Sequence, residues 1–378
     1  MNAFIQELEQ HAHEPPQAVD NWLATQHLPH VDGRTVTFVF HGEADSVHLR
    51  HWIFGLPSSQ AFTRMPRTLL WHLTVDLPEN SRVEYKLEIA RGAAHRLVHD
   101  PLNQARALDP FGSNSVIYGT GYEVPGWTEP DHETREGHLE EHDLHSNALG
   151  GKQKFQIYFP ARYRTLRRYP LLIAHDGLDY LRFARFKRVL DNLIHRLELP
   201  SMLVALIQST DRMREYADDP RHAQFLTQEL VPHLEGKYPL LANPGARGLM
   251  GASFGAVASL ATAWRYPGFF GNLMLQSGSF VFTDVGNHDR GPMFDPVVKF
   301  MNSFRMSPGR PSERVYLSCG QYESLIYYNR SMVPLLQQTG MQVRFSESRD
   351  GHNWENWRDR MREGLSYLFP GPLWFVYE

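Results

Sequence analysis

Cysteine is almost absent from this sequence: Cys319 is the only one among 378 residues. An intramolecular disulfide is therefore impossible, and the 42% hydrophobic residues must supply the stability through a buried core. Such low cysteine usage is typical of reducing compartments. The first ten residues are acidic and amphipathic, without the positive start and apolar run of a signal peptide. We therefore expect a soluble, cytoplasmic protein.

Long apolar runs, an excess of one charge and nucleotide-binding motifs are also missing. No apolar stretch approaches the roughly 20 residues that span a bilayer. A net charge of −4 and a pI near 6.6 give no attraction to nucleic acid or to an acidic membrane. Residues 141–145 contain two histidines but not the His-Glu-x-x-His zinc pattern, and no phosphate-binding loop occurs. We expect no nucleic-acid or membrane partner, no metal and no cofactor; the oligomeric state stays undetermined.

The N-terminal third alternates apolar and polar residues. After two short helices predicted at 3–13 and 18–26, residues 35–40, 71–77 and 83–89 have the period of two that marks half-buried antiparallel strands. Turn residues separate them. The pattern predicts a small immunoglobulin-like β-sandwich.

The pattern of apolar residues changes after a stretch at 121–137 that contains prolines and few aliphatic residues. We therefore place a domain boundary near residue 130, which gives domains 1–130 and 131–378. Short apolar runs then alternate with helical patterns, as in sheets whose strands are buried on both faces. The predicted fold class is α/β, a mostly parallel sheet with helices on both faces, preceded by the sandwich. The predicted strands are 155–159, 171–174, 202–207, 249–250, 273–275, 315–317 and 343–345, with helices at 186–197 and 223–234.

Within this second domain, Gly251-Ala252-Ser253-Phe254-Gly255 lies between an apolar pair and good helix-forming residues. Strand, sharp turn and helix form the setting of a nucleophile elbow, in which the turn exposes the serine hydroxyl. Side chains at Gly251 and Gly255 would collide with the neighbouring strand and helix. The pattern predicts Ser253 as a catalytic nucleophile.

A serine hydroxyl needs an adjacent base, and histidine titrates near neutrality. His352 follows the last predicted strand, where catalytic groups of open α/β sheets gather. Glu323 follows the preceding strand and is our choice for the acid that orients His352. The aspartates of the intervening segment stay open as alternatives: Asp284, Asp289 and Asp295.

An oxyanion hole needs two amide donors at the developing charge. The N–H of Phe254 directly follows the nucleophile. The loop His175-Asp176-Gly177-Leu178 follows an earlier strand, and its glycine allows the amide of Leu178 to point inward. We predict Phe254 and Leu178 as the donors, with Asp176 bracing the loop.

Three ordered motifs together resemble the esterase D family of α/β-hydrolases. They are residues 169–177, the elbow at 251–255, and Gly351-His352-Asn353-Trp354 with the residues through 358; residues 212–216 match as well. The resemblance covers about residues 135–370. The preceding sandwich, with Asp100-Pro101-Leu102-Asn103 and Pro125-Gly126-Trp127, is similar to the enterochelin esterases of that family.

This resemblance implies hydrolysis of an iron-siderophore trilactone in the cytoplasm by Ser253, Glu323 and His352, with the sandwich walling the substrate site. A ferric catecholate is anionic and calls for basic and aromatic contacts. Arg212, Tyr216 and Trp354 are the substrate-binding candidates that the motifs contain, although Trp354 also fits the core face of the last helix. Other basic candidates are Arg182, Arg185, Lys187 and Arg214. Alternatives are a feruloyl or acetyl sugar esterase, an acyltransferase on the same triad, or a non-enzymatic ligand-binding module.

Overall fold

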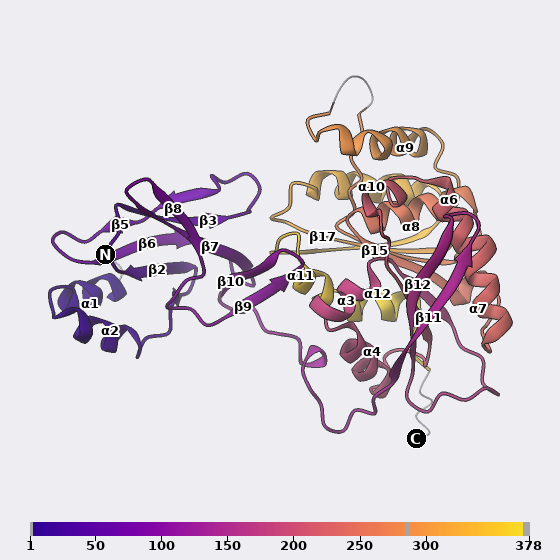
Figure 1. Ribbon diagram of the computed structural model, residues 1–378, viewed down its shortest axis with the longest axis horizontal. Coiled ribbons are helices and arrows are strands. Elements are labelled where there is room, and N and C mark those ends of the chain that lie inside the picture. The colour runs from indigo at the N-terminus through magenta and orange to yellow at the C-terminus, as the bar shows by residue number, and fades with distance from the viewer. Residues whose placement is uncertain (1–2, 284–287, 373–378) are drawn as a thin grey trace. The chain divides into compact units, whose positions relative to one another are not determined.

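The chain forms two compact units in a computed structural model that describes residues 3–283 and 288–372 (Figure 1). The first unit contains residues 1–123 together with two short later segments, 321–324 and 348–352. The second contains residues 124–320, 325–347 and 353–378. The contacts therefore divide the chain after Glu123 and assign to the first unit two segments that sequence patterns had not linked to it.

The first unit is a β-sandwich of two antiparallel sheets. One sheet has the order β1-β2-β6-β5, and the other has the order β4-β3-β7-β10-β9, with β8 pairing β7. The helices and strands are α1 (Ala3–His11), α2 (Pro16–Leu23), β1 (His30–Asp32), β2 (Thr35–His41), β3 (Ser46–His51), β4 (Ser59–Ala61), β5 (Thr63–Arg64), β6 (Leu70–Asp76), β7 (Arg82–Arg91), β8 (Ala94–Val98), β9 (Arg106–Asp109) and β10 (Gly112–Tyr118). The sandwich predicted from the period of two is confirmed.

Alternation decides which side chains fill the sandwich. Phe38, Val47 and Leu87 belong to one buried cluster that draws on both sheets. Residues of the opposite parity on β2, such as Val39, join a second cluster with α1 and α2. β2 is thus buried on both faces, whereas β3 alternates buried and half-buried positions.

The second unit is built on an eight-stranded sheet with the order β11-β12-β14-β13-β15-β16-β17-β18. β13 to β17 pair in parallel where they are neighbours, and β11 and β12 add an antiparallel edge. The strands are β11 (His138–Ser146), β12 (Gly151–Phe159), β13 (Leu171–Ala174), β14 (Leu203–Ile207), β15 (Arg247–Ala252), β16 (Asn272–Gln276), β17 (Arg314–Gly320) and β18 (Gln342–Ser348). The α/β architecture predicted from the apolar runs is confirmed.

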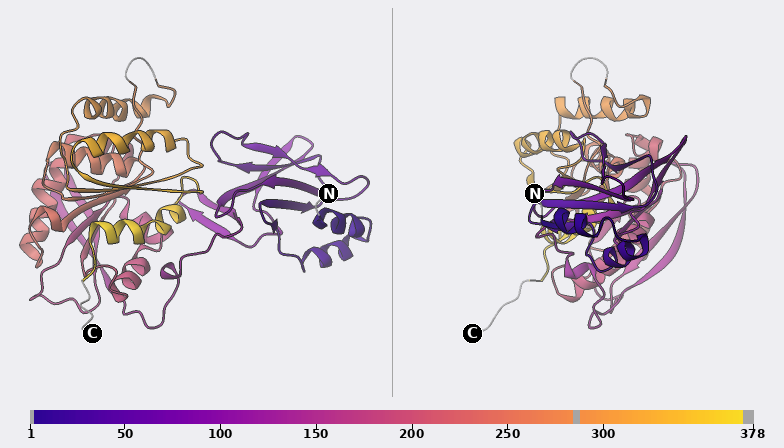
Figure 2. Two further views of the ribbon diagram at one scale, coloured as in Figure 1. Left: turned by 180° about the vertical axis from the view of Figure 1, so that it is seen from behind. Right: turned by 90° about the vertical axis from the view of Figure 1, so that its left-hand side faces the viewer.

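Helices cover both faces of this sheet, as Figure 2 shows. One buried cluster includes residues of α8, α9 and α10, and another includes residues of α3, α4 and α12 on the opposite face. The helical segments are η1 (Gly126–Thr128), α3 (Gly177–Phe183), α4 (Phe186–His195), α5 (Arg212–Glu215), α6 (Pro220–Gln224), η2 (Phe225–Leu230), α7 (Val231–Lys237), η3 (Pro244–Ala246), α8 (Phe254–Arg265), η4 (Pro292–Phe294), α9 (Asp295–Met306), α10 (Ile326–Gln338), α11 (Trp354–Asp359) and α12 (Met361–Leu368).

The single helix predicted at 223–234 is wrong in detail. The segment is α6, then a π-helical turn η2, then α7. Pro232 has no N–H to donate to the preceding turn, and the Thr227 hydroxyl donates to the carbonyl of Ala223 at 2.8 Å. The widened turn accommodates both features.

Candidate active site

Ser253 occupies a sharp turn between β15 and α8. Its backbone has φ 58° and ψ −118°, a region that residues other than glycine rarely adopt. The Ser253 N–H donates to the carbonyl of Gln276 at 2.9 Å, and the Ser253 carbonyl accepts from the N–H of Ser279 at 3.2 Å. The turn is therefore held by the loop that follows the neighbouring strand β16.

The two glycines of the elbow allow the backbone to approach closely. A Cβ on Gly251 would lie 2.4 Å from the backbone carbon of Gly255, a distance that no side chain tolerates. A Cβ on Gly255 would lie 3.2 Å from the Cβ of His175. The steric need for glycine that the sequence predicted is confirmed at Gly251, and Gly255 is tight.

Ser279 is a neighbour of Ser253 that sequence patterns did not single out. Its Oγ lies 3.1 Å from the Oγ of Ser253, and Ser279 is almost fully buried. Ser279 follows β16 in an irregular Ser-Gly-Ser loop, where periodicity carries no signal. The nucleophile candidate thus has a hydroxyl partner within its own unit.

The loop after β13 is braced by an ion pair. The Arg212 Nε donates to the carboxylate of Asp176 at 2.8 and 3.0 Å, and its Nη2 donates to the carbonyl of Ala252 at 3.3 Å. Burial raises the pKa of Asp176, and the guanidinium opposes that shift. Arg212 therefore joins the loop before α3 to the end of β15. Leu178 lies in the first turn of α3, and Phe254 is the first residue of α8.

Two buried histidines lie beneath this loop. The Nδ1–H of His175 donates to the carbonyl of Met250 at 3.0 Å, so His175 Nε2 accepts from His222 Nε2–H, also at 3.0 Å. Burial lowers the pKa of His175 to about 4 and that of His222 well below its ordinary value. Both rings are neutral near pH 7, and the pair is a rigid polar support under the elbow.

The other two triad candidates meet in the first unit. The Nδ1 of His352 lies 2.7 Å from the Oε2 of Glu323. The Glu323 side chain is 1% exposed and that of His352 is 39% exposed. With Nδ1–H donating to the carboxylate, Nε2 carries the lone pair that a general base uses.

Two of the alternative acids have an exposed position. Asp295 accepts from His288 at 2.9 Å and is exposed, and Asp289 is exposed as well. Asp284 lies outside the described residues. Of the carboxylates considered from the sequence, the structure brings Glu323 to His352.

The predicted substrate-binding residues are mostly engaged in the fold. Tyr216 is fully buried, and its hydroxyl accepts the N–H of Asp176, so direct substrate contact is not supported for it. Arg212 is held by Asp176. Trp354 begins α11 and is 9% exposed, in edge contact with Tyr180 and Trp357. These three side chains are held by contacts within the fold, so we assign them a supporting role.

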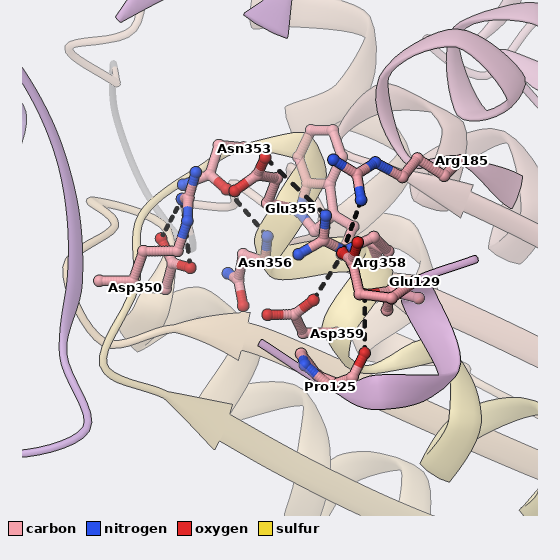
Figure 3. Close-up of polar contacts among 12 residues, drawn as sticks. Pro125, Glu129, Arg185, Asp350, Asn353, Glu355, Asn356, Arg358 and Asp359 are labelled. Carbon is pink, nitrogen blue, oxygen red and sulfur yellow. Dashed lines mark hydrogen bonds and ion pairs between the residues drawn. The ribbon is translucent and has the colours of Figure 1, made fainter. Parts of the chain in front are cut away.

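Three of the other basic candidates, Arg185, Lys187 and Arg214, form ion pairs, and Arg182 lies over the ring of Phe183. Arg185 donates to Glu129 at 2.7 Å, as Figure 3 shows. Lys187 bridges Glu136 and Asp191. Within the same close-up, the side chain of Asn353 accepts the N–H of Asn356 and caps α11. Arg185 and Lys187 line one hollow of the second unit together with the acidic residues Glu136 and Asp191.

The described part of the chain contains neither a cluster of metal-binding side chains nor a membrane-spanning helix. No group of three or more His, Cys, Asp or Glu side chains within residues 3–283 and 288–372 could hold a metal ion. Over the same ranges, every helix is too short or too polar to cross a bilayer.

Comparison with known proteins shows a family of esterases. A family model described as "Putative esterase" matches residues 146–368, more than half of the chain. The uncharacterized protein YjcH of Bacillus subtilis is 26% identical over 244 residues, which are 62% of this chain and 98% of that protein. The iron(III) enterobactin esterase of Escherichia coli K12 is 25% identical over 345 residues, 82% of each chain.

The fold also matches a solved structure. The crystal structure of ferric enterobactin esterase from Salmonella typhimurium superimposes with a TM-score of 0.76 at 20% identity. The match covers 92% of this chain and 98% of the other. At that identity the likeness shows a shared architecture, with a sandwich followed by an α/β-hydrolase unit.

Proposed function

This chain belongs to the esterase family whose model matches residues 146–368 and is a hydrolase that acts on esters, and we propose that it works through an acyl-enzyme on Ser253. The observation that carries the proposal is the 2.7 Å contact between Glu323 and His352. Ser253, Glu323 and His352 each follow a strand of the same sheet, β15, β17 and β18. Catalytic groups of open α/β sheets gather at such strand ends.

In this mechanism the Ser253 Oγ attacks the ester carbonyl carbon while Nε2 of His352 takes the hydroxyl proton. The amides of Phe254 and Leu178 hold the oxyanion of the tetrahedral intermediate. Collapse of the intermediate breaks the bond to the alcohol, which leaves with the proton from His352. Water then attacks the acyl-enzyme with His352 as base, and Ser253 is regenerated. Glu323 orients the ring and stabilises the imidazolium.

The substrate that we propose is a catecholate siderophore trilactone, with iron(III) as its cargo. The support is the likeness to iron(III) enterobactin esterase of Escherichia coli and a match that extends through the sandwich as well as the hydrolase unit. Arg185 pairs with Glu129 and Lys187 pairs with two carboxylates, so acidic partners balance the positive charge that these two side chains offer to the anionic complex. We place this activity in the cytoplasm, since the single cysteine, Cys319, is buried and unbridged.

The nucleophile is tested by covalent labelling. A fluorophosphonate probe should modify Ser253, as located by peptide mass spectrometry, and the Ser253→Ala variant should remain unlabelled. Ser303→Ala is the matched control, because it removes the hydroxyl of a serine in the exposed part of α9. Labelling at another serine in the wild-type protein would contradict the proposal.

The substrate is tested by a hydrolysis panel. Ferric and iron-free enterobactin should be hydrolysed with a higher kcat/KM than feruloylated or acetylated sugars. Addition of an acceptor alcohol separates hydrolysis from acyl transfer, since a transferase would form the new ester. Preference for the sugar esters would replace the siderophore proposal while leaving Ser253 as the nucleophile.

A further inference from the structure

Asp350, two residues before the base candidate His352, forms a buried ion pair with Arg82. Arg82 begins β7, and its side chain is 0% exposed. Its Nη1 lies 3.3 and 3.5 Å from the two carboxylate oxygens of Asp350, whose side chain is 6% exposed. Asp350 and His352 belong to one short segment of the first unit. The guanidinium of Arg82 thus holds the backbone segment that leads to His352.

Backbone bonds hold the same segment. The N–H of Arg82 donates to the carbonyl of Arg349 at 2.9 Å, and Arg349 donates from its guanidinium to the carbonyl of Glu79 at 2.7 Å. The Asp350 carboxylate also accepts the N–H of Gly351 at 2.7 Å. Side-chain and backbone contacts therefore converge on the residues directly before His352.

The segment that carries the acid is tied to the same site. The N–H of Tyr322 donates to the carbonyl of Asp350 at 3.1 Å, and the Tyr322 hydroxyl lies 2.5 Å from the Oγ of Ser81. Tyr322 directly precedes Glu323. Residues 81 and 82 of the sandwich therefore hold both segments, the one with the acid and the one with the base.

The chemistry explains why arginine stands at position 82. Its Nη2 donates to Glu84 at 3.0 Å while Nη1 faces Asp350, so one planar fork serves two carboxylates. Loss of the guanidinium would remove one cation from two buried carboxylates, Asp350 and Glu84. Because 39% of the His352 side chain is exposed, packing alone does not immobilise the ring.

We propose that Arg82 is a positioning residue for ester hydrolysis: through Asp350 it sets the place of His352 relative to Glu323. This inference rests on the triad proposed above. A displacement of about 1 Å at a catalytic group can cost about 10²-fold in rate, so the ion pair acts on kcat although Arg82 need not touch the substrate.

The test measures kcat and KM on a p-nitrophenyl ester, at a temperature where thermal melts show each variant folded. Arg82→Met should lower kcat about 10²-fold with KM within about threefold. Arg82→Lys keeps the charge but loses the planar fork, so it should recover only part of that loss, about tenfold. Asp350→Asn keeps an acceptor for Gly351 and should lower kcat about tenfold. The double variant Arg82→Met with Asp350→Asn should lose less than the product of the two single losses, because the partners are coupled.

The matched control is Arg50→Met. Arg50 pairs with Glu88 of the same strand β7 at 2.7 Å, but its side chain is 39% exposed. This variant should change kcat by less than about twofold. A folded Arg82→Met protein with wild-type kcat, or one in which only KM rises, overturns the inference. If Arg82→Met does not fold, Asp350→Asn decides: wild-type kcat overturns the inference and a selective fall in kcat supports it.

The Ser253→Ala variant separates this inference from the proposed function. If that variant keeps normal turnover, the triad itself is wrong, whatever Arg82→Met does. If Ser253→Ala is inactive and both Arg82→Met and Asp350→Asn are fully active, the triad stands and only the positioning role fails.

Discussion

The Nδ1 of His352 lies 2.7 Å from the Oε2 of Glu323, and the acid is buried while the ring is partly exposed. A carboxylate shielded from water makes a strong charge-assisted bond to an imidazolium. The ring is partly exposed, and its second nitrogen is the one that proton transfer uses. The buried Glu323 thus orients the ring, and the partly exposed His352 transfers the proton.

Replacement of Glu323 by glutamine should lower kcat at least about 10²-fold, since an amide stabilises the imidazolium less and no longer enforces the tautomer. Steady-state hydrolysis of a p-nitrophenyl ester provides the measurement. Asp295→Asn serves as the control, because Asp295 pairs with His288 at the surface. Full activity of Glu323→Gln together with loss in Asp295→Asn would assign the acid to Asp295 instead.

Substitution of Ser253 by alanine should lower kcat by at least about 10³-fold and leave the fold intact, because the hydroxyl that forms the acyl-enzyme is removed. Circular dichroism should show an unchanged spectrum. Near-normal turnover in a folded Ser253→Ala protein would contradict the serine mechanism.

The buried histidine pair makes stability depend on pH. The pKa of His175, about 4 in the folded protein, lies below the value of about 6.5 in an unfolded chain, and that of His222 is lowered as well. The unfolded chain therefore binds more protons in between, and the free energy of unfolding falls as the pH drops from about 6.5 toward 4. Arg212 also lowers the pKa of His175, and Glu215 lies 3.9 Å from His222.

The variant His222→Gln should weaken this dependence, since glutamine can still donate to His175 but does not titrate. Thermal melts at pH 7 and pH 5 should show a smaller fall in Tm for the variant, at about 2–4 °C for each kcal/mol of difference. His95→Gln, at an exposed position of β8, should behave like the wild type. Equal falls in Tm for all three proteins would rule out the pair as a titrating element.

Two glycine-to-alanine variants should move stability in opposite directions. Gly251→Ala places a methyl group 2.4 Å from backbone and should destabilise the protein by about 1–3 kcal/mol or more. Gly236 in α7 has open space around its Cβ position, so Gly236→Ala should stabilise by roughly 0.4–1 kcal/mol. Urea unfolding measures both. A neutral Gly251→Ala would show that the elbow is less tightly packed than its geometry indicates.

Local patterns were enough to predict most of the fold. β13 has the bounds expected from its apolar run, and β2 differs from the expected strand by one residue. Alternation and apolar runs are properties of neighbouring residues, so a linear sequence displays them. The helix predicted at 223–234 lies in a continuous helical segment, but helical periodicity does not register its π-helical turn, which contains the Thr227 hydroxyl bond and precedes Pro232.

The binding candidates show a limit of motif reading. Arg212 and Tyr216 belong to the segment 212–216 on which the resemblance to esterases partly rests, yet the structure uses them to hold Asp176, which is 36 and 40 residues away. A motif marks residues that stay together in a site, but it does not tell a residue that touches the substrate from one that supports the loop beside it.

The sequence by itself determined the elbow at Ser253, because the signals for a strand, a turn and a helix come from neighbouring residues. It also showed that His352 follows the last strand. Only the tertiary structure decided which carboxylate meets His352 and which side chain holds its segment. Glu323 is 29 residues from His352, and Arg82 is 268 residues from Asp350. Such pairs form when folding brings distant segments together, and their free energy comes from burial and charge that no local pattern encodes.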